Sequence, residues 1–318
     1  MSKPLVSVVI PTYKRPDKLR RATRSVADQT YPNIELIVVD DHSPQPAADT
    51  LATESFEDLD LVCLRHEENR GANQARNTGI READGEYIAL LDDDDDWRPE
   101  KISRQVEVFE NSDDDVGVVY TGCEYDYGDY TRDVIFTCEG DVTEDLLVGK
   151  SFGEFSTLMV RTDVVFEAGL PDERFPSWQD REWLIRLSQH AEFRVISELL
   201  TRRHCPEGEE RISNNYTEKR DVSFPLLVEK HRDLAKSHGR KYERAFLASL
   251  LFILGQEALR NRFYGDARKQ LLKSVYYYPF HTDRLVYALV ALGGRLSYEP
   301  ARLAVRTMHA ISDGTVTE

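Results

Sequence analysis

The chain of 318 residues carries 41 basic and 57 acidic side chains, so its formal net charge at pH 7 is −16. This charge excludes bare nucleic acid as a partner, because nucleic-acid binding depends on Lys and Arg that neutralise phosphates. Hydrophobic residues make up 41% of the chain, enough for a sizeable core, and the length fits one large domain with an appendage.

The acidic residues are spread over the whole length instead of forming a tail. Such a chain suits concentrated salt, where screening weakens self-repulsion, and this predicts a halophilic source; an ordinary acidic cytosolic protein is the alternative. We expect neither a disulfide framework nor a zinc site, because the four cysteines are far apart in the sequence. No apolar stretch reaches the roughly 18 residues that a membrane span needs, and we expect a cytoplasmic protein.

The first hundred residues predict strands that alternate with helices. Short β-branched apolar runs are typical of buried strands, and the segments between them have helical spacing. This alternation predicts an α/β fold with a doubly wound, mostly parallel sheet that helices cover on both faces. The predicted strands are 5–10, 34–41, 61–66 and 87–91, with helices that begin at Pro16 and cover 72–83.

The pattern becomes less regular after about residue 106. A strand at 116–121, an apolar segment at 156–161 and a helix around 178–190 indicate a second half with antiparallel strands. After about residue 216 the strand signals end. Residues 245–279 predict a helix pair broken at 264–266, and one copy is too little for a repeat array. We predict an α/β domain over 1–215, with halves 1–105 and 106–215, and a helical extension over 216–318.

Five consecutive carboxylates, Asp92 to Asp96, follow the apolar run 87–91. Ligands bind beyond the carboxyl ends of strands in an open parallel sheet, and this run lies at such an end. Adjacent carboxylates repel one another unless a cation compensates them, and hard oxygen ligands suit Mg²⁺ or Mn²⁺. The alternative for the run alone is a solvated acidic loop.

A second acidic pair, Asp40 and Asp41, ends the strand at 34–41 and should reach the same edge of the sheet. Two carboxylate clusters at one edge favour a site over mere solubility. No GxGxxG follows the first strand, and no GxxxxGK[ST] occurs anywhere. These absences argue against a dinucleotide dehydrogenase and a P-loop enzyme, and they predict that phosphate is held mainly through a metal.

Two segments carry a family resemblance: VSVVIPTYKRPDKLRRATRSVADQTYPNIELIVVDDHS and NRGANQARNTGIREADGEYIALLDDDDDW. They resemble the donor half of family-2 glycosyltransferases with the GT-A fold. The match is dense over residues 5–105 and thinner to about 215. It is specific for the family and much less specific for the sugar.

The resemblance implies a role for each matching residue in the donor half. The base pocket would be lined by Pro11, Thr12 and Tyr13, with Tyr13 stacked on uracil. Asp41, with Asp40 beside it, would hydrogen-bond the base, and Asp92-x-Asp94 would be the DxD motif. The donor-binding residues are then Pro11, Thr12, Tyr13, Asp40, Asp41, Arg76, Asn77, Asp92 and Asp93, and Asp94 is the metal ligand.

In the second half, SWQDREWLIRLS resembles the segment that supplies the catalytic base, with Gln179 in place of the usual Glu. Asp180 matches the base, which must take the proton of the attacking hydroxyl group. One carboxylate opposite the leaving group implies inversion. A helix N-terminal carboxylate is the alternative for Asp180. His204 matches a histidine that can ligate the metal, although a lone histidine is as often structural.

The resemblance therefore implies an inverting, metal-dependent transferase that uses a nucleoside-diphosphate sugar, with UDP as the expected nucleotide. The acceptor would be a sugar or a lipid-linked sugar in surface-glycan or lipid-linked oligosaccharide assembly. Two alternatives stay open: a sugar-1-phosphate nucleotidyltransferase and a non-catalytic sugar-nucleotide binder or scaffold. The apolar stretches FLASLLFIL and LVYALVAL suggest peripheral contact with the cytoplasmic face of a membrane, and ordinary helix packing explains them as well.

Overall fold

The structure is a computed structural model that describes residues 3–52, 54, 56, 59–205 and 215–300. The chain divides into two compact units, and the first holds residues 1–143, 151–174 and 179–207. The second unit holds 144–150, 175–178 and 208–318. The domain boundary that the sequence suggests at 215 stays a prediction.

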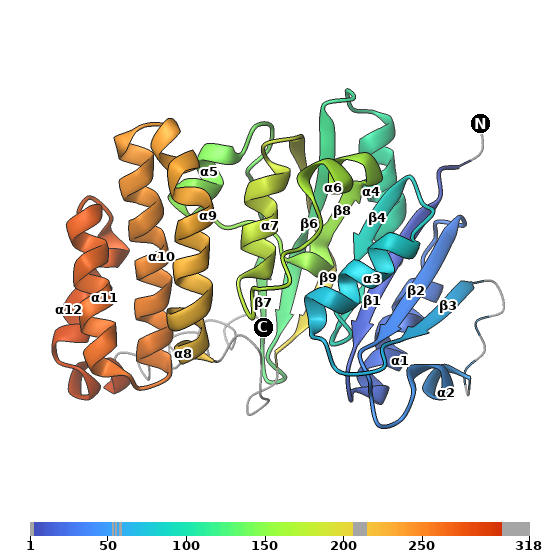
Figure 1. Ribbon diagram of the computed structural model, residues 1–318, viewed down its shortest axis with the longest axis horizontal. Coiled ribbons are helices and arrows are strands. Elements are labelled where there is room, and N and C mark those ends of the chain that lie inside the picture. The colour runs from blue at the N-terminus through green and yellow to red at the C-terminus, as the bar shows by residue number, and fades with distance from the viewer. Residues whose placement is uncertain (1–2, 53, 55, 57–58, 206–214, 301–318) are drawn as a thin grey trace, which may run out of the picture. The chain divides into compact units, whose positions relative to one another are not determined.

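A nine-stranded mixed sheet forms the centre of the first unit, as far as the structure describes it (Figure 1). The strands follow the order β3-β2-β1-β4-β8-β6-β9-β5, and β7 pairs with β6. Strands β1 to β4 run parallel to one another, whereas β8 is antiparallel to β4 and β6. The bounds are β1 Val6–Thr12, β2 Ile34–Asp40, β3 Asp60–Arg65, β4 Tyr87–Leu90, β5 Asp95–Trp97, β6 Val116–Asp126, β7 Thr131–Val134, β8 Leu158–Arg161 and β9 Glu192–His204.

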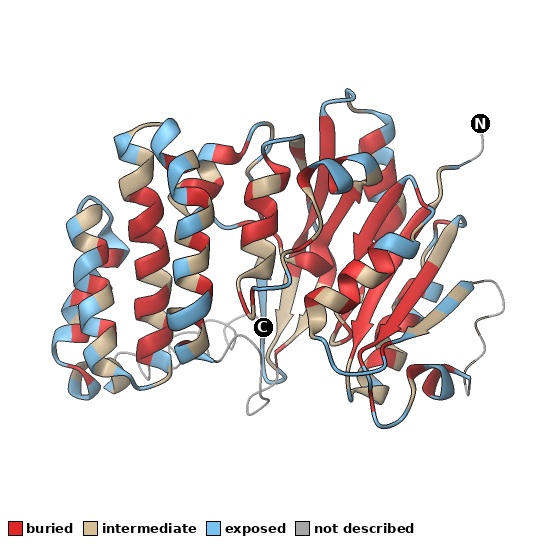
Figure 2. Ribbon diagram, viewed as in Figure 1, coloured by how far each residue is buried: buried red, intermediate tan, exposed pale blue. Residues whose placement is uncertain are grey.

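Strands β1 and β4 and the last five residues of β2 are buried, as their apolar runs predict, whereas β3 at the edge of the sheet is exposed or half-buried (Figure 2). Every residue of β1 is buried, and its register sets Thr12 opposite Asp40 of β2. The doubly wound, mostly parallel sheet is therefore confirmed. Because β1 and β2 are parallel and their last residues are paired, the residues that follow them reach the same edge of the sheet.

Amphipathic helices cover this sheet. Pro16 begins the first of them, α1, where a missing N–H is tolerated, and Leu19, Ala22 and Val26 form its buried face. The third, α3, lies so close to β1 that a Cβ atom on Gly79 would be 2.4 Å from Cγ1 of Val9. The helices of this unit are α1 Pro16–Ala27, α2 Ala47–Leu51, α3 Ala72–Glu82, α4 Lys101–Glu110, α6 Thr162–Ala168 and α7 Gln179–Leu187.

The acidic run holds a strand that the sequence does not predict. Asp95–Trp97 forms β5, which pairs with β9. In the strand order of the sheet, β5 stands four positions away from β4. Four positions span about 19 Å in a flat sheet, and residues 91–94 could bridge at most about 18 Å if fully extended. These residues instead turn sharply, so the sheet must curl to bring β5 back toward β4.

The second unit is helical within its described residues, as the sequence predicts. α10 is buried along most of its length, and Gly255 lets it approach Leu271 of α11 closely (Figure 2). The predicted break of the helix pair is displaced, because α11 already begins at Tyr264. The elements are α5 Thr143–Val148, α8 Tyr216–Glu218, a π-helical turn Lys219–Ser223, α9 Phe224–Ser237, α10 Arg240–Arg260, α11 Tyr264–Tyr277 and α12 Thr282–Leu292.

Candidate functional site

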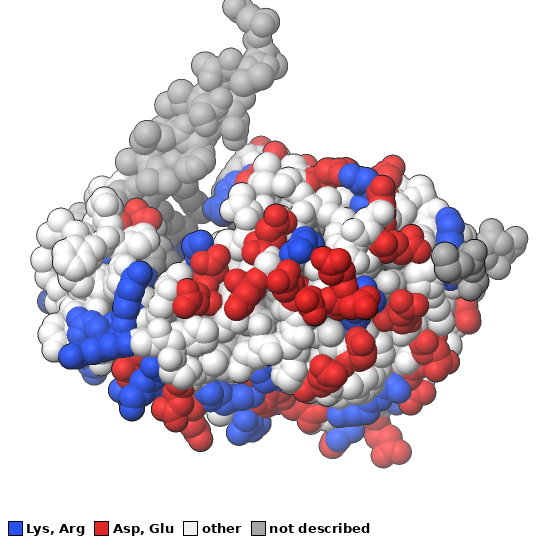
Figure 3. Space-filling view, turned by 90° about the horizontal axis from the view of Figure 1, so that it is seen from above, with Lys and Arg blue, Asp and Glu red and all other residues white. Residues whose placement is uncertain are grey.

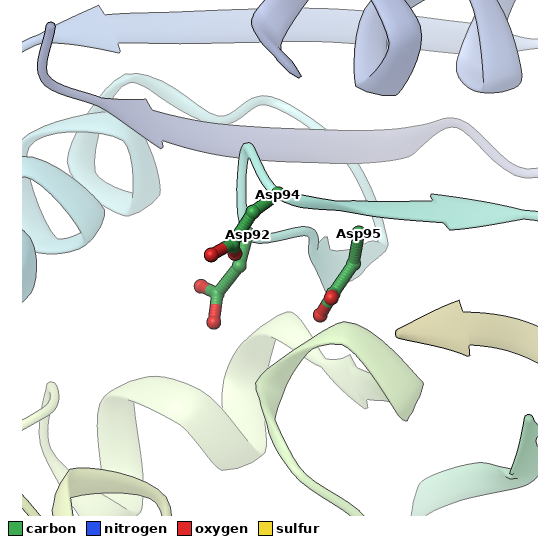
Figure 4. Close-up of side chains that lie close together, drawn as sticks. All are labelled: Asp92, Asp94 and Asp95. Atoms are coloured by element: carbon green, nitrogen blue, oxygen red, sulfur yellow. The ribbon is translucent and has the colours of Figure 1, made fainter. Parts of the chain in front are cut away.

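The carboxylates after β4 gather in the turn that leads into β5. Ligand oxygens of Asp92, Asp94 and Asp95 all lie within 4.8 Å of one another. Figure 4 shows the three side chains pointing to the same side of this turn, with Asp92 and Asp94 next to each other. Among the described residues, this is the group of acidic, His or Cys side chains with spacing suited to a metal ion.

One oxygen of this group lacks a hydrogen-bond partner. Oδ2 of Asp95 accepts from the Ser156 hydroxyl at 2.6 Å, whereas its Oδ1 is buried without a partner in the described structure. A buried, unpaired carboxylate oxygen is costly unless a cation compensates it. The residues therefore fit a hard divalent cation such as Mg²⁺ or Mn²⁺.

Burial sets the protonation of this cluster. It raises the pKa of Asp95 to about 8, with the Asp94 and Asp92 carboxylates adding to the effect. It also raises the pKa of Asp93 to about 6, against the opposing charge of Arg15. Asp92 differs, because burial, the largest single effect, is outweighed by Arg76, Arg203 and Arg15 together, and the pKa of Asp92 is lowered.

Three arginines that the sequence does not point to surround the acidic turn. Nη1 of Arg15 lies 3.0 Å from both Asp93 Oδ1 and Asp94 Oδ2. Arg21 donates to the Asp94 carbonyl at 2.7 Å, and Arg203 stands opposite Asp95 in the β5–β9 pair. The turn is thus held by cations from α1, from the loop before it and from β9.

The acidic pair after β2 has a different environment. The two oxygens of Asp40 accept from the N–H groups of Ser43 and Ala47 and from Arg65. Asp41 is buried with a carboxylate that accepts from His66 Nδ1 at 2.7 Å and from the N–H groups of Arg70 and Gly71. Both carboxylates hold nearby loops together.

Thr12, which the resemblance places in the base pocket, donates to Asp93 Oδ2 at 2.7 Å. Pro11 is buried in β1, and half-buried Tyr13 has the Lys14 ammonium group 4.5 Å from its ring centroid. A hollow of about 190 Å³ lies beside this segment. It is lined by Thr12, Lys14, Arg15, Pro16, Leu19, Ser43, Pro44, Gln45, Ala47 and Thr50.

Arg76 connects the acidic turn to the start of α7. Its Nη2 donates to Asp92 at 2.5 Å, and its Nη1 donates to Gln179 at 3.0 Å. The guanidinium group is buried and lies 4.1 Å from the ring centroid of Phe155. Two halves of the first unit therefore meet at one buried cation.

Asn77 lies one residue further along α3 and contacts a different segment. Its Nδ2 donates at 2.9 Å to the Pro171 carbonyl and to Glu173. The structure thus ties Asn77 to the loop before α7, whereas it brings Arg76 to the acidic turn. A nucleotide contact of Asn77 stays a prediction.

Asp180 follows Gln179 in the first turn of α7 and is partly accessible to solvent. Its Oδ1 accepts from the N–H of Arg181 at 2.8 Å. Burial raises the pKa of Asp180, and the nearby Asp92 carboxylate contributes to the increase. The two groups are therefore close enough to influence each other electrostatically.

His204, at the end of β9, lies between two other carboxylates. Its Nε2 is 2.5 Å from Asp96 Oδ2, and its Nδ1 is 3.4 Å from Asp126 Oδ2. It does not belong to the group of Asp92, Asp94 and Asp95. Its assignment as a metal ligand stays a prediction.

The profile of the family "Glycosyl transferase family 2" matches residues 7–166. Among curated relatives, TuaG of Bacillus subtilis, whose name assigns it to teichuronic acid biosynthesis, is 41% identical over 33% of this chain and 42% of its own. An uncharacterized glycosyltransferase of Rickettsia felis is 30% identical over 68% of this chain and 37% of its own. The chain thus spans about two fifths of the length of these relatives.

Solved structures share the fold at low identity. The crystal structure of TarS from S. aureus superposes with a TM-score of 0.64 at 17% identity, covering 92% of this chain and 54% of that one. The mannosyltransferase PcManGT of Pyrobaculum calidifontis, solved with GDP-Man and Mn²⁺, superposes with a TM-score of 0.51 at 17% identity. The match covers 98% of this chain and 81% of that one. No helix of the described residues is long and apolar enough to cross a membrane.

Proposed function

The chain belongs to glycosyltransferase family 2, and from this premise we propose that it transfers a sugar from a nucleoside-diphosphate sugar to an acceptor hydroxyl group. UDP is the proposed nucleotide, and one of the TarS structures was solved with UDP-GlcNAc. The family assignment disfavours the nucleotidyltransferase alternative. A non-catalytic binder is a possible outcome of the experiments below.

One observation carries the proposal: three carboxylates converge at the strand ends, and Asp95 Oδ1 is buried without a partner. We propose that Asp92, Asp94 and Asp95 hold Mn²⁺ or Mg²⁺. A divalent cation, when bound, stabilises the negative charge that develops on a departing diphosphate. Asp92 and Asp94 are half-buried and so are the members of the group that a donor could approach.

The nucleotide would lie along the end of β1. Tyr13 is half-buried and presents a ring on which a base can stack, next to the hollow that Thr12 and Lys14 help to line. Lys14 and Arg15 bring positive charge to this segment, which suits a diphosphate. Asp41 is proposed to recognise the base, and its contacts with residues 66–71 also shape the wall of this region.

Asp180 is the proposed general base. A carboxylate with a raised pKa holds a proton more readily, which is what deprotonation of an acceptor hydroxyl group requires. Arg76 fixes the neighbouring Gln179 relative to Asp92, so the base and the diphosphate site share one buried connection. Attack assisted by a single carboxylate opposite the leaving group would invert the anomeric carbon.

The acceptor is proposed to be a sugar or a lipid-linked sugar in surface-glycan or lipid-linked oligosaccharide assembly. This rests on the family and on the TuaG relative, whose name assigns it to teichuronic acid biosynthesis. The charge of −16 suits work in concentrated salt, and assays belong in such buffers.

The first test is calorimetric titration of UDP in high-salt buffer with and without Mn²⁺. We expect metal-dependent binding by the wild type and at least a tenfold loss in Asp94→Ala. Asp114→Ala is the matched control, because Asp114 is an exposed carboxylate in the loop before β6. This variant should bind UDP like the wild type. Equal UDP affinity in Asp94→Ala and the wild type would refute the metal assignment.

The second test separates chemistry from binding. Asp180→Asn should retain UDP binding while its turnover of a UDP-sugar falls by about 10²–10⁴-fold, the range for a lost general base. UDP binding without turnover by the wild type on any donor would favour the non-catalytic binder.

A further inference from the structure

Most of the exposed large hydrophobic side chains of the described residues lie in the second unit. Fourteen large hydrophobic side chains of the described residues are exposed, and nine of them lie between residues 263 and 296. Clusters of this kind mark interaction sites, whereas single exposed apolar residues need no explanation. The nine are Phe263, Leu272, Tyr276, Phe280, Leu285, Val286, Leu289, Leu292 and Leu296.

Helical spacing arranges many of these side chains into one stripe. Leu285, Leu289 and Leu292 recur at the three- and four-residue intervals that place side chains on one helix face. Ala288 and Ala291 face the core of the unit instead. Leu289 is 67% exposed, so α12 presents a second apolar face that this unit leaves uncovered.

Basic residues accompany the apolar surface. Residues 260–300 contain seven Lys or Arg and three Asp or Glu, in a chain with 41 and 57 overall. On α11, exposed Arg268, Lys269 and Lys273 flank Leu272 and Tyr276. Figure 3 shows blue side chains among white ones at the end where α11 and α12 lie in Figure 1.

One further cation in this segment lacks a counter-ion. Arg284 of α12 is 5% exposed, and its Nε and Nη1 are buried without hydrogen-bond partners among the described residues. Its guanidinium carbon lies 5.3 Å from the ring centroid of Tyr278. The Arg284 guanidinium group therefore has no ion-pair partner among the described residues, although α12 as a whole carries no net charge because it also contains Asp283.

We propose that the exposed faces of α11 and α12, with Phe280 in the turn between them and Leu296 shortly after α12, dock the chain on an anionic lipid surface. Apolar side chains beside Lys and Arg suit the boundary between headgroups and acyl chains. Tyr276 and Phe280, 73% and 90% exposed, are the kind of aromatic residues that favour this depth. A symmetric contact with a second copy is disfavoured, because it would bring two basic segments together.

The test is flotation of the full chain with vesicles of phosphatidylcholine alone and with about one third phosphatidylglycerol. We expect the wild type to float with the anionic vesicles. Leu289→Gln/Leu296→Gln should lower the partition coefficient at least about tenfold by removing apolar contact. Arg268→Gln/Lys269→Gln/Lys273→Gln should lower it roughly 100-fold at low ionic strength and less at high salt.

Phe166→Gln is the matched control, because Phe166 is 52% exposed in the first unit, and it should float like the wild type. Circular dichroism and UDP binding establish that each variant is folded. A folded wild type that stays unbound, or that binds both vesicle types equally, overturns the proposal. Light scattering that shows a dimer, lost in Leu289→Gln/Leu296→Gln, would assign the face to a second copy instead.

Discussion

Two acidic clusters end neighbouring parts of the same sheet, and they differ in how their charge is compensated. Asp40 and Asp41 accept hydrogen bonds from backbone N–H groups, from Arg65 and from His66. Asp95, at the start of β5, has a buried oxygen without a hydrogen-bond partner among the described residues. Hydrogen bonds from the chain itself compensate the charge of the first cluster, whereas the second cluster fits a bound metal ion.

The comparison shows why the position of a carboxylate is not enough to assign its role. Both clusters lie at strand ends, where ligands bind in open sheets. Only the hydrogen-bond inventory separates a carboxylate whose charge is already compensated from one that needs a cation. The predictions below test that separation, from the largest expected effect to the smallest.

Asp41→Ala should lower the free energy of unfolding by about 3 kcal/mol, because it leaves the Arg70 and Gly71 N–H groups and His66 without their acceptor. Denaturant unfolding at constant salt measures this loss. Asp94→Ala, in the other cluster, is the comparison. It should change the free energy of unfolding of the metal-free protein by less than about 1 kcal/mol. Similar losses in the two variants would contradict the contrast.

Asp95→Asn should weaken Mn²⁺ binding at least about tenfold without destabilising the metal-free protein, since a neutral amide replaces a buried carboxyl group. Calorimetry and thermal unfolding measure the two quantities. Asp96→Asn is the control, because Asp96 contacts His204 and lies outside the group of three. An equal loss of Mn²⁺ affinity in the control would bring His204 into the metal site.

The pH dependence follows from the raised pKa values of Asp93, about 6, and Asp95, about 8. Between about pH 4 and 8 the folded metal-free chain holds more protons than the unfolded chain, so these groups make it less stable as pH rises. Metal binding displaces such protons. Mn²⁺ affinity should therefore rise by up to about tenfold per pH unit between pH 6 and 8, and a flat profile would speak against these sites.

Gln179→Glu should have the smallest effect. It gives Arg76 a charged partner but adds negative charge beside Asp180. We expect the acidic limb of the rate–pH profile to move upward by less than about one unit, with little change in UDP affinity. Gln179→Ala is the control, since it removes the Arg76 contact without adding charge and should leave the limb in place.

The sequence predicts the parallel half of the fold because its signals are local. The apolar runs, Pro16 at the start of α1 and the loss of strand signals after about 216 all depend on neighbouring residues. β5 could not be predicted, because three residues within an acidic run form a strand only when β9 is beside them. The family resemblance and the GT-A fold are both confirmed.

The site was predictable in part. The acidic run stands out in the sequence, the family resemblance points to Arg76, and the structure brings the two together. Arg15, Arg203 and Ser156 carry no local signal, because each reaches the turn from a distant part of the chain.

The interleaved course of the chain has a consequence for recombination between relatives. The helical unit includes 144–150 and 175–178, which belong by sequence to the preceding half. Glu144 hydrogen-bonds Tyr242, and the Phe175 ring lies beneath Lys230. A chimaera joined once at residue 215 would combine these contacts from two parents. Exchange of the helical unit therefore requires three segments to be transplanted together.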